Sequence, residues 1–328
     1  MDLEQSTRNS YFGKYVNRAQ RGIEIGPSYR PTFAKRDGWN VLTMDHCSQE
    51  DLISKYRDEK IDEKFISNIE KVDYIWTGQT YEDLFNGQGD FDFIVASHVI
   101  EHAPDVLSFL VETSNLLKDG GYLLLAVPDK KATFDFYRPN TTIGDVIIGH
   151  LSPELYDLKA LIDESHLRSN LDGAIAWNRE VSIKNLRNQN FPRPSYETKV
   201  IEEILNRTLK EGVVENREYR DAHRWIFTPE ILQDLIGLMS DAGLINYQVI
   251  DWTHTGYYEF LMVLQKKNKC TSIPNSRFLA LSEFIPNFTG SDSTLSDNPV
   301  GTIPISLKSR YLKKIIHIAK GFKKSLMN

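Results

Sequence analysis

Residues 21–31 read RGIEIGPSYRP, a short apolar run that stops at a glycine. This pattern is typical of a buried parallel strand that ends in a tight turn, where the backbone can approach a ligand at the carboxyl edge of a sheet. Ser28 stands where the dinucleotide fingerprint G-x-G-x-x-G has its second glycine, and the sequence contains no G-x-x-x-x-G-K-[ST] phosphate loop. The turn therefore disfavours a pyrophosphate and favours a nucleoside ligand that lacks one.

Two acids accompany this turn. Asp45 ends the next strand-like run, about 20 residues after Glu24, where a carboxylate can accept hydrogen bonds from both hydroxyls of a ribose. Glu24 lies inside the first strand and is suited to bind an amine or to order the turn. Each acid alone could be a solvated loop residue or a helix cap, but together they favour a nucleoside site.

Short apolar runs alternate with helix-period segments over the first 130 residues, which predicts βαβ units and a mostly parallel sheet. A helix is expected over 104–118, ending at Gly120-Gly121, and a second begins at Thr228-Pro229 and runs to Gly243. The expected strands are 22–26, 40–45, 72–77, 91–97, 121–127, 246–252 and 257–265.

The remaining segments suggest appendages to this α/β core. We expect the core in 1–130 and 228–267, an insertion or lid that faces the acceptor in 131–227, and a linker rich in Ser, Asn, Thr and Pro in 268–304. Residues 305–328 have the pattern of a basic amphipathic helix. Such a helix could contact an anionic membrane face or an acidic partner, or could dock on the acidic body with its lysines solvated.

Composition narrows the class of protein. The 328 residues are 41% hydrophobic and 26% charged, as in soluble globular proteins. Two cysteines rule out a disulfide framework, and without a signal pattern or a long apolar run we expect a cytoplasmic protein that does not span a membrane. Residues 301–328 hold seven Lys or Arg and no acid, so residues 1–300 carry a net charge of −13, which argues against a nucleic-acid partner.

Four motifs occur in order: RGIEIGPSYRP at 21–31, MD at 44–45, FDFIVASHVIEHAPD at 91–105 and LLKDGGYLLLAVPD at 116–129. This set resembles class I S-adenosylmethionine-dependent methyltransferases, and the segment 228–265 fits the same fold. The resemblance implies a Rossmann-like, seven-stranded, mostly parallel sheet with an insertion after the fifth strand, and S-adenosylmethionine as the cofactor. The SHVIEH segment and the TFDFYRP that follows Pro128-Asp129 are similar to bacterial methyltransferases of cell-surface polysaccharide biosynthesis.

The resemblance also implies positions for the cofactor. Gly26, Pro27 and Ser28 would form the turn under its methionine part, Glu24 would lie beneath it, and Asp45 would hold the ribose. Many relatives place an acid followed by a small residue at the end of the third strand, near the adenine. This chain has Trp76, Thr77 and Gly78 there instead, so stacking or backbone contacts would hold the base. Ser97 and His98 would face the methionine end and the acceptor.

The segment His98-Val99-Ile100-Glu101-His102 also matches H-x-x-E-H, an inverted zinc-protease motif. That motif belongs within a long helix, whereas here a strand-like run precedes it and Pro104 follows it closely. We therefore interpret His102 as a packed histidine that orders the loop, and we expect no metal site.

Methyl transfer needs alignment of the acceptor with the methyl carbon and, for a hydroxyl acceptor, a base. The candidate bases are His98, Asp129 and His150, with His223 a weaker one. Lys130, Lys131 and Arg138 could bind an anionic acceptor or could be solvated loop residues. Aromatic residues of the insertion could stack on sugars or pack the lid: Phe134, Phe136, Tyr137, Trp177, Phe191, Tyr196, Tyr219 and Trp225.

The sequence therefore predicts a methyltransferase that O-methylates a small-molecule or glycan acceptor, namely a sugar, glycolipid or polysaccharide intermediate, at the inner face of the membrane or in the cytoplasm. The alternative is a catalytically inactive scaffold of the same fold in a glycan-assembly complex. A nicotinamide-dependent oxidoreductase is disfavoured, because its pyrophosphate would lack a glycine-rich turn.

Overall fold

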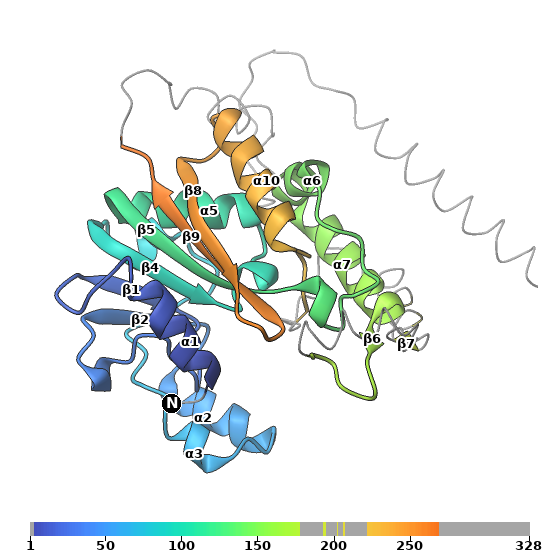
Figure 1. Ribbon diagram of the computed structural model, residues 1–328, viewed down its shortest axis with the longest axis horizontal. Coiled ribbons are helices and arrows are strands. Elements are labelled where there is room, and N and C mark those ends of the chain that lie inside the picture. Colours follow the sequence, from blue (N-terminus) through green and yellow to red (C-terminus); the bar gives the residue numbers. More distant parts are fainter. Residues whose placement is uncertain (1–2, 178–192, 195–201, 203–205, 207–221, 269–328) are drawn as a thin grey trace, which may run out of the picture. The chain divides into compact units, whose positions relative to one another are not determined.

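The computed structural model describes residues 3–177, 193–194, 202, 206 and 222–268 (Figure 1). The α-helices are α1 (Leu3–Phe12), α2 (Gln49–Asp58), α3 (Glu63–Ile66), α4 (Tyr81–Leu84), α5 (Val106–Leu116), α6 (Ile143–Leu151), α7 (Pro153–Leu167) and α10 (Pro229–Asp241). The strands are β1 (Gly22–Ile25), β2 (Val41–Asp45), β3 (Tyr74–Ile75), β4 (Phe91–Ser97), β5 (Leu117–Pro128), β6 (Ser169–Asn170), β7 (Arg193–Pro194), β8 (Tyr247–His254) and β9 (Glu259–Lys266). Short 3-10 turns are η1 (Lys35–Asp37), η2 (Ile100–His102) and η3 (Lys130–Ala132).

Seven strands form one sheet in the order β3-β2-β1-β4-β5-β9-β8. The pairs from β3 to β5 are parallel, and β9 runs antiparallel to both of its neighbours. This confirms the predicted seven-stranded, mostly parallel sheet of the class I methyltransferase fold. The chain order reverses between β1 and β4, so the first βα turn lies where ligands bind in open α/β sheets.

Alternation along the central strands gives the sheet two buried faces. Side chains such as Ile94 and Ala96 join the cluster that α5 and α10 cover, whereas Phe93 and Val95 join the cluster that contains Phe12 of α1 (Figure 1). Burial on both faces explains why these strands read as continuous apolar runs in the sequence.

Capping residues fix where α5 and α10, the two helices on one face of the sheet, begin. The Asp105 carboxylate accepts hydrogen bonds from the backbone N–H groups of Leu107 and Ser108 and caps α5. The Thr228 hydroxyl accepts from Ile231, with Pro229 at the first helical position of α10, as the sequence predicts.

Two predicted boundaries are wrong. The strand expected over 72–77 is limited to Tyr74–Ile75, and the boundary between the helix at 104–118 and the next strand is misplaced. The helix expected to stop at Gly120-Gly121 ends at Leu116, and β5 begins at Leu117, so both glycines lie within the strand. Phe91 pairs with Leu117 across a register shift, which lets β5 start earlier than its apolar run.

Between β5 and α10, the described part of the chain contains η3, α6, α7 and the short β6–β7 ladder. The predicted linker after Asn268 and the predicted basic helix at 305–328 lie outside the described residues. Among the described residues, no helix has the length and apolarity needed to cross a bilayer.

Candidate functional site

The strand ends gather most of the residues predicted to bind the cofactor. Ile25 pairs with Met44 on one side and with Ala96 on the other, so Gly26, Asp45 and Ser97 follow at one edge of the sheet. The Gly26 N–H donates to the Met44 carbonyl at 2.8 Å, and the Trp76 N–H donates to the Asp45 carbonyl at 2.8 Å. Four strands thus bring their predicted site residues together.

The turn after β1 needs the glycine that the sequence places there. Gly26 has a φ of +63°, and a Cβ at this position would lie 3.0 Å from Cγ2 of Val99. Ser28 is also left-handed, with a φ of +49°. The turn therefore packs closely against the residue that follows His98, and little room exists for a side chain at Gly26.

Glu24 orders this turn. Its carboxylate is 1% exposed and accepts hydrogen bonds from the backbone N–H groups of Thr32 and Phe33. Burial raises the pKa of Glu24 to about 7, although the two N–H donors oppose that shift. The Thr32 hydroxyl lies 3.1 Å from that of Ser97, which ties the turn to the end of β4.

One carboxylate oxygen of Asp45 accepts a hydrogen bond, and the other has no donor among the described residues. Oδ1 accepts from the backbone N–H of His46 at 2.8 Å and lies 2.6 Å from Nδ1 of its ring. Oδ2 is buried and has no hydrogen-bond partner among the described residues. A buried carboxylate oxygen without a donor is costly, so this atom suits a ligand hydroxyl.

The segment that follows β3, Trp76 to Gly78, forms a local turn held by its own hydrogen bonds. The Trp76 indole N–H donates to the Gln79 carbonyl at 2.7 Å, and its ring packs against the sheet cluster. Gly78 has a φ of +105°, and a Cβ added there would have no described atom within 4 Å, so its side is open.

His98 lies between two carboxylates. It has a φ of +55°, rare for a residue with a side chain, and its ring nitrogens lie 2.7 Å from Oε2 of Glu259 and 3.4 Å from Oε1 of Glu101. Burial opposes its charge, but the two carboxylates outweigh burial and raise the pKa of His98 to about 9. At neutral pH the ring therefore carries both protons, which disfavours the base role predicted for it and favours a positioning role.

The other two predicted bases lie in structural contacts. The Asp129 carboxylate accepts from the backbone N–H of Lys131 and caps η3, and it lies 3.7 Å from the His254 ring. Nδ1 of His150, on α6, lies 2.7 Å from the Asp105 carboxylate that caps α5, and this contact raises the pKa of His150. The catalytic roles of Asp129 and His150 stay predictions.

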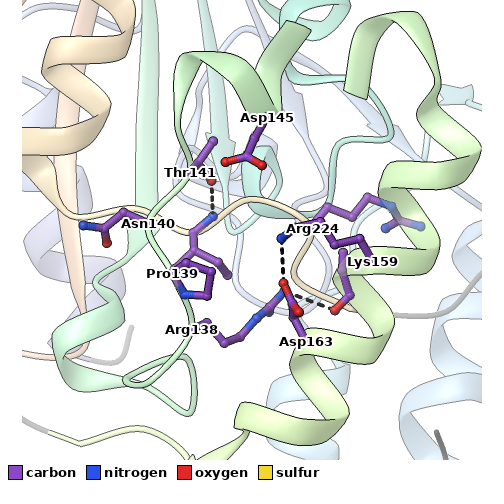
Figure 2. Close-up of a pocket in the computed structure, with 10 residues that line it drawn as sticks. Arg138, Pro139, Asn140, Thr141, Asp145, Lys159, Asp163 and Arg224 are labelled. Atoms are coloured by element: carbon purple, nitrogen blue, oxygen red, sulfur yellow. Dashed lines mark hydrogen bonds and ion pairs between the residues drawn. The ribbon is translucent and has the colours of Figure 1, made fainter. Parts of the chain in front are cut away.

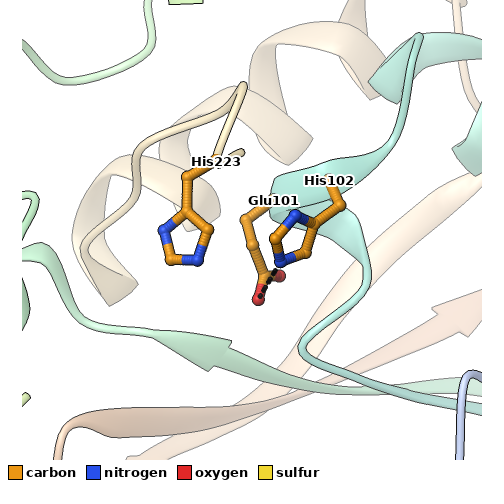
Figure 3. A group of neighbouring side chains, drawn as sticks. All are labelled: Glu101, His102 and His223. Atoms are coloured by element: carbon orange, nitrogen blue, oxygen red, sulfur yellow. Dashed lines mark ion pairs between the residues drawn. The ribbon is translucent and has the colours of Figure 1, made fainter. Parts of the chain in front are cut away.

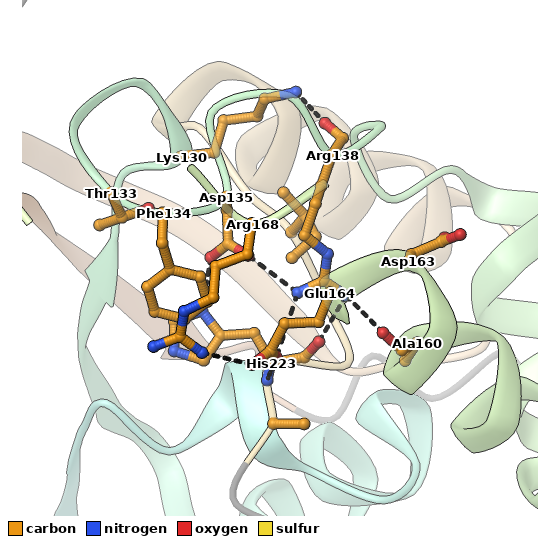
Figure 4. Close-up of polar contacts among 12 residues, drawn as sticks. Lys130, Thr133, Phe134, Asp135, Arg138, Ala160, Asp163, Glu164, Arg168 and His223 are labelled. Carbon is orange, nitrogen blue, oxygen red and sulfur yellow. Dashed lines mark hydrogen bonds and ion pairs between the residues drawn. The ribbon is translucent and has the colours of Figure 1, made fainter. Parts of the chain in front are cut away.

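Arg138 is not available to bind an acceptor. Its guanidinium is buried and donates to Asp135 and to the carbonyls of Ala160 and His223, within the network of Figure 4. The Lys130 ammonium donates to the Arg138 carbonyl. The anionic-acceptor interpretation therefore fails for Arg138, because its charge is satisfied inside the protein.

A polar pocket lies beside this network, between the loop that precedes α6 and the helix α7 (Figure 2). Lys159 and Asp163 form an ion pair of 2.6 Å on its α7 side. Its ten lining residues are Arg138, Pro139, Asn140, Thr141, Asp145, Lys159, Ala160, Asp163, Arg224 and Ile226.

The aromatic residues of the insertion mostly pack. Trp177 and Phe136 belong to a small cluster with Ala132 and Leu171, and Trp225 is 1% exposed in the main core. Tyr137 is 38% exposed, whereas Phe191, Tyr196 and Tyr219 lie outside the described residues. Packing of the insertion onto the sheet explains the described rings better than a sugar-stacking surface does.

Sequence reasoning missed the acid that holds His98. Glu259 begins β9 and is fully buried, and both of its oxygens accept hydrogen bonds from Arg8 of α1. These bonds and His98 outweigh burial and lower the pKa of Glu259 to about 2. The one available signal was an acid inside the apolar run YYEFLMVLQ, because a buried charge requires a partner.

The profile of a family described as a methyltransferase domain matches residues 7–187. A search of curated proteins finds no match.

Solved structures with a similar fold include three methyltransferases. An S-adenosylmethionine-dependent methyltransferase from Thermotoga maritima is 15% identical, with a TM-score of 0.35, over 81% of this chain and 90% of that one. One from Mesorhizobium loti is 10% identical, with a TM-score of 0.39, over 81% and 100%. The magnesium protoporphyrin IX methyltransferase of Synechocystis, with bound S-adenosylhomocysteine, is 10% identical, with a TM-score of 0.36, over 80% and 84%.

Proposed function

The chain belongs to the methyltransferase domain family, and we propose that it transfers a methyl group to an oxygen of a sugar, glycolipid or polysaccharide intermediate in the cytoplasm. It is a methyltransferase whose cofactor is S-adenosylmethionine. The choice of acceptor is supported by the resemblance of the SHVIEH and TFDFYRP segments to polysaccharide-linked methyltransferases. Contact of residues 305–328 with an anionic membrane or an acidic partner stays a prediction from the sequence.

The observation that carries the cofactor assignment is the open carboxylate oxygen of Asp45. Oδ2 is buried and lacks a donor among the described residues, and it lies one strand away from the close-packed turn at Gly26. The hydroxyl groups of a ribose would supply the missing donors. An inactive scaffold has no need to keep such a costly group, so the geometry disfavours that alternative.

The chain's own residues would then divide the work. The cofactor supplies an activated methyl group on a sulfonium. Asp45 would hold the ribose, the turn at Gly26 to Ser28 would lie under the methionine part, and Trp76 would border the adenine. In the transfer, the methyl carbon bonds to the acceptor oxygen, the carbon–sulfur bond breaks with its electron pair left on sulfur, and the hydroxyl proton leaves to a base or water. Most of the rate would come from aligning the acceptor with the methyl group and from excluding water. His98, protonated between two carboxylates, would hold the acceptor side of the site in place.

Calorimetric titration tests the cofactor site. S-adenosylmethionine and S-adenosylhomocysteine are expected to bind and NAD is not. Asp45→Asn keeps the shape of the side chain but removes its charge, and should weaken binding by roughly 10- to 100-fold, since hydrogen bonds to a charged group contribute about 1.5–3 kcal/mol. Asp58→Asn, at the exposed end of α2, makes the same change away from the site and should leave affinity unchanged. Equal affinities of the two variants would remove Asp45 from the site.

Release of S-adenosylhomocysteine with candidate acceptors tests the substrate class. Sugars, sugar nucleotides and glycolipids that carry free hydroxyls should support turnover, whereas amines of similar size should not. Turnover with the amines alone would overturn the oxygen-acceptor assignment and leave the cofactor assignment standing.

A further inference from the structure

The loop after β4 brings three potential metal ligands together. Glu101 and His102 are consecutive in η2, and His223 comes from the segment that precedes α10. One ligand atom from each residue lies within 4.8 Å of the others (Figure 3). Two segments far apart in the chain thus place a carboxylate and two imidazoles around one point.

The Glu101 carboxylate lacks the hydrogen bonds that a buried acid needs. The side chain is 1% exposed, and neither oxygen has a hydrogen-bond partner among the described residues. The nearest ring nitrogens are Nδ1 of His98 at 3.4 Å and Nε2 of His102 at 3.8 Å from Oε1. His98 balances part of this buried charge from 3.4 Å, and a bound cation would supply the direct contact that both oxygens lack.

Both histidines are held by the nitrogen that points away from Glu101. Nδ1 of His223 lies 2.5 Å from the Asp135 carboxylate, and Nδ1 of His102 lies 3.1 Å from the Ala222 carbonyl. A histidine that ligates a metal almost always donates its other ring N–H to a carboxylate or a backbone carbonyl, which fixes the tautomer and the orientation of the ring. The arrangement therefore has outer contacts of the kind that metal-binding histidines use.

A deeper network supports the first of these contacts. Asp135 accepts a 2.8 Å hydrogen bond from Arg138, which also donates at 2.7 Å to the carbonyl of His223 (Figure 4). The backbone N–H of His223 donates to Glu164 at 3.0 Å. His223 is thus fixed through both its ring and its backbone, which is what a preformed ligand requires.

We propose that Glu101, His102 and His223 bind a divalent first-row transition-metal cation, with Zn²⁺ the cation of first choice. One carboxylate with two imidazoles is a ligand set of catalytic zinc sites, which keep an open position for water or substrate. This site goes beyond the methyl-transfer function proposed above and replaces the expectation of no metal. The sequence motif alone could not reveal it, because the third ligand lies far downstream of H-x-x-E-H.

The position of the site indicates what the cation would do. Glu101 lies against His98 at the carboxyl end of β4, the side where the acceptor is expected. A hydroxyl bound at the open position would lose its proton to water more readily, because a divalent cation stabilises the alkoxide. An oxygen acceptor would therefore need no strong protein base, in agreement with the structural contacts of Asp129 and His150.

The test titrates the full-length chain, freed of metal by a chelator, with Zn²⁺ alone at about pH 8, where ligand protons compete less. One Zn²⁺ should bind per chain, and Co²⁺ at the same site should give visible absorption bands. Glu101→Gln, which keeps the side-chain shape, and His223→Ala should each lower the affinity by at least about 10- to 100-fold, the effect of losing even an outer-shell contact. His166→Ala, an exposed histidine on α7, serves as the matched control and should keep the affinity.

The outcomes are separable from those of the cofactor test. Circular dichroism of each variant identifies any that fails to fold. If His223→Ala is unfolded, the Zn²⁺ affinity of Glu101→Gln alone tests the site. Absence of stoichiometric Zn²⁺ binding, or equal affinity in Glu101→Gln and in the unmodified chain, would overturn the site. S-adenosylmethionine titrated into the same samples reports on the methyltransferase assignment independently, because that binding uses Asp45 and Gly26.

Discussion

At the scale of single residues, Gly26 is a position where a side chain would strain the backbone and also disturb the turn expected to bind the cofactor. Its φ of +63° costs a residue with a side chain about 1–2 kcal/mol, and the added Cβ would also press on Val99 at 3.0 Å. Gly87 has a similar φ of +70° but no described atom within 4 Å of such a Cβ. Gly26→Ala should therefore reduce both stability and cofactor affinity, whereas Gly87→Ala should carry the backbone cost alone.

Urea unfolding and calorimetric titration of both alanine variants separate the two effects. The difference between their unfolding free energies measures the contact with Val99. Equal losses of stability together with unchanged cofactor affinity at Gly26 would show that the turn tolerates a methyl group.

The sequence could predict the position of a site residue when that residue comes directly after a strand. The shared position of Gly26, Asp45 and Ser97 was predictable, because parallel strands present their carboxyl ends at one edge. The grouping of His223 with Glu101 and the contact of Glu259 with His98 were not, because they join segments far apart in the chain. Arg138 was misread for a related reason: its guanidinium also donates to the carbonyls of Ala160 and His223, which distant segments of the chain bring to it.

At the scale of elements, α6 docks through one glycine. A Cβ at Gly149 would lie 2.4 Å from the Trp225 ring, so only a glycine lets the helix approach this buried side chain. Trp225 in turn donates its indole N–H to the Ala103 carbonyl at 2.6 Å, and its backbone N–H donates to the Glu101 carbonyl. The helix, the tryptophan and the η2 loop therefore form one packed unit beside His223.

Gly149→Ala should destabilise the protein by about 1–3 kcal/mol through overpacking against Trp225. At Gly144, in the same helix, an added Cβ would meet only the Thr142 hydroxyl among the described atoms, at 3.6 Å, so Gly144→Ala should be neutral or stabilising by up to about 1 kcal/mol. Chemical denaturation of both variants checks the sign. Destabilisation of similar size in both would show that α6 is sensitive to any added methyl group, irrespective of Trp225.

The same logic explains which element boundaries the sequence could predict. Strands buried on both faces stand out as apolar runs, and α10 carries its own start signal in Thr228-Pro229. The early start of β5 did not stand out, since Lys118 and Asp119 are exposed polar residues that lie between the paired positions Leu117 and Tyr122. Propensity marks the core of an element, whereas tertiary pairing sets its end.

At the scale of the whole molecule, Arg8 and Glu259 join α1 to β9, the first helix and the last strand of the described residues. Nε and Nη2 of Arg8 donate to the carboxylate at 3.0 and 2.5 Å, and His98 adds a third contact from the middle of the chain. The folded-state pKa of Glu259 is about 2, against a reference value of 4.5. Its contribution to stability is thus fully present above about pH 4.5 and is lost as the pH falls toward 2.

Glu259→Gln should lower the free energy of unfolding at neutral pH by roughly 3–5 kcal/mol, because it leaves the buried Arg8 guanidinium and the partly buried His98 ring beside an uncharged amide. The variant should also lose less further stability than the unmodified chain between pH 4.5 and 3, since the titrating carboxylate is gone. Urea unfolding at a series of pH values measures both effects. Glu63→Gln supplies the control: Glu63 also pairs with an arginine, Arg57, but on the surface, where screening by solvent makes the pair weak. If Glu259→Gln proved no more harmful than Glu63→Gln, the contacts of Glu259 with Arg8 and His98 would not be what joins α1 to β9.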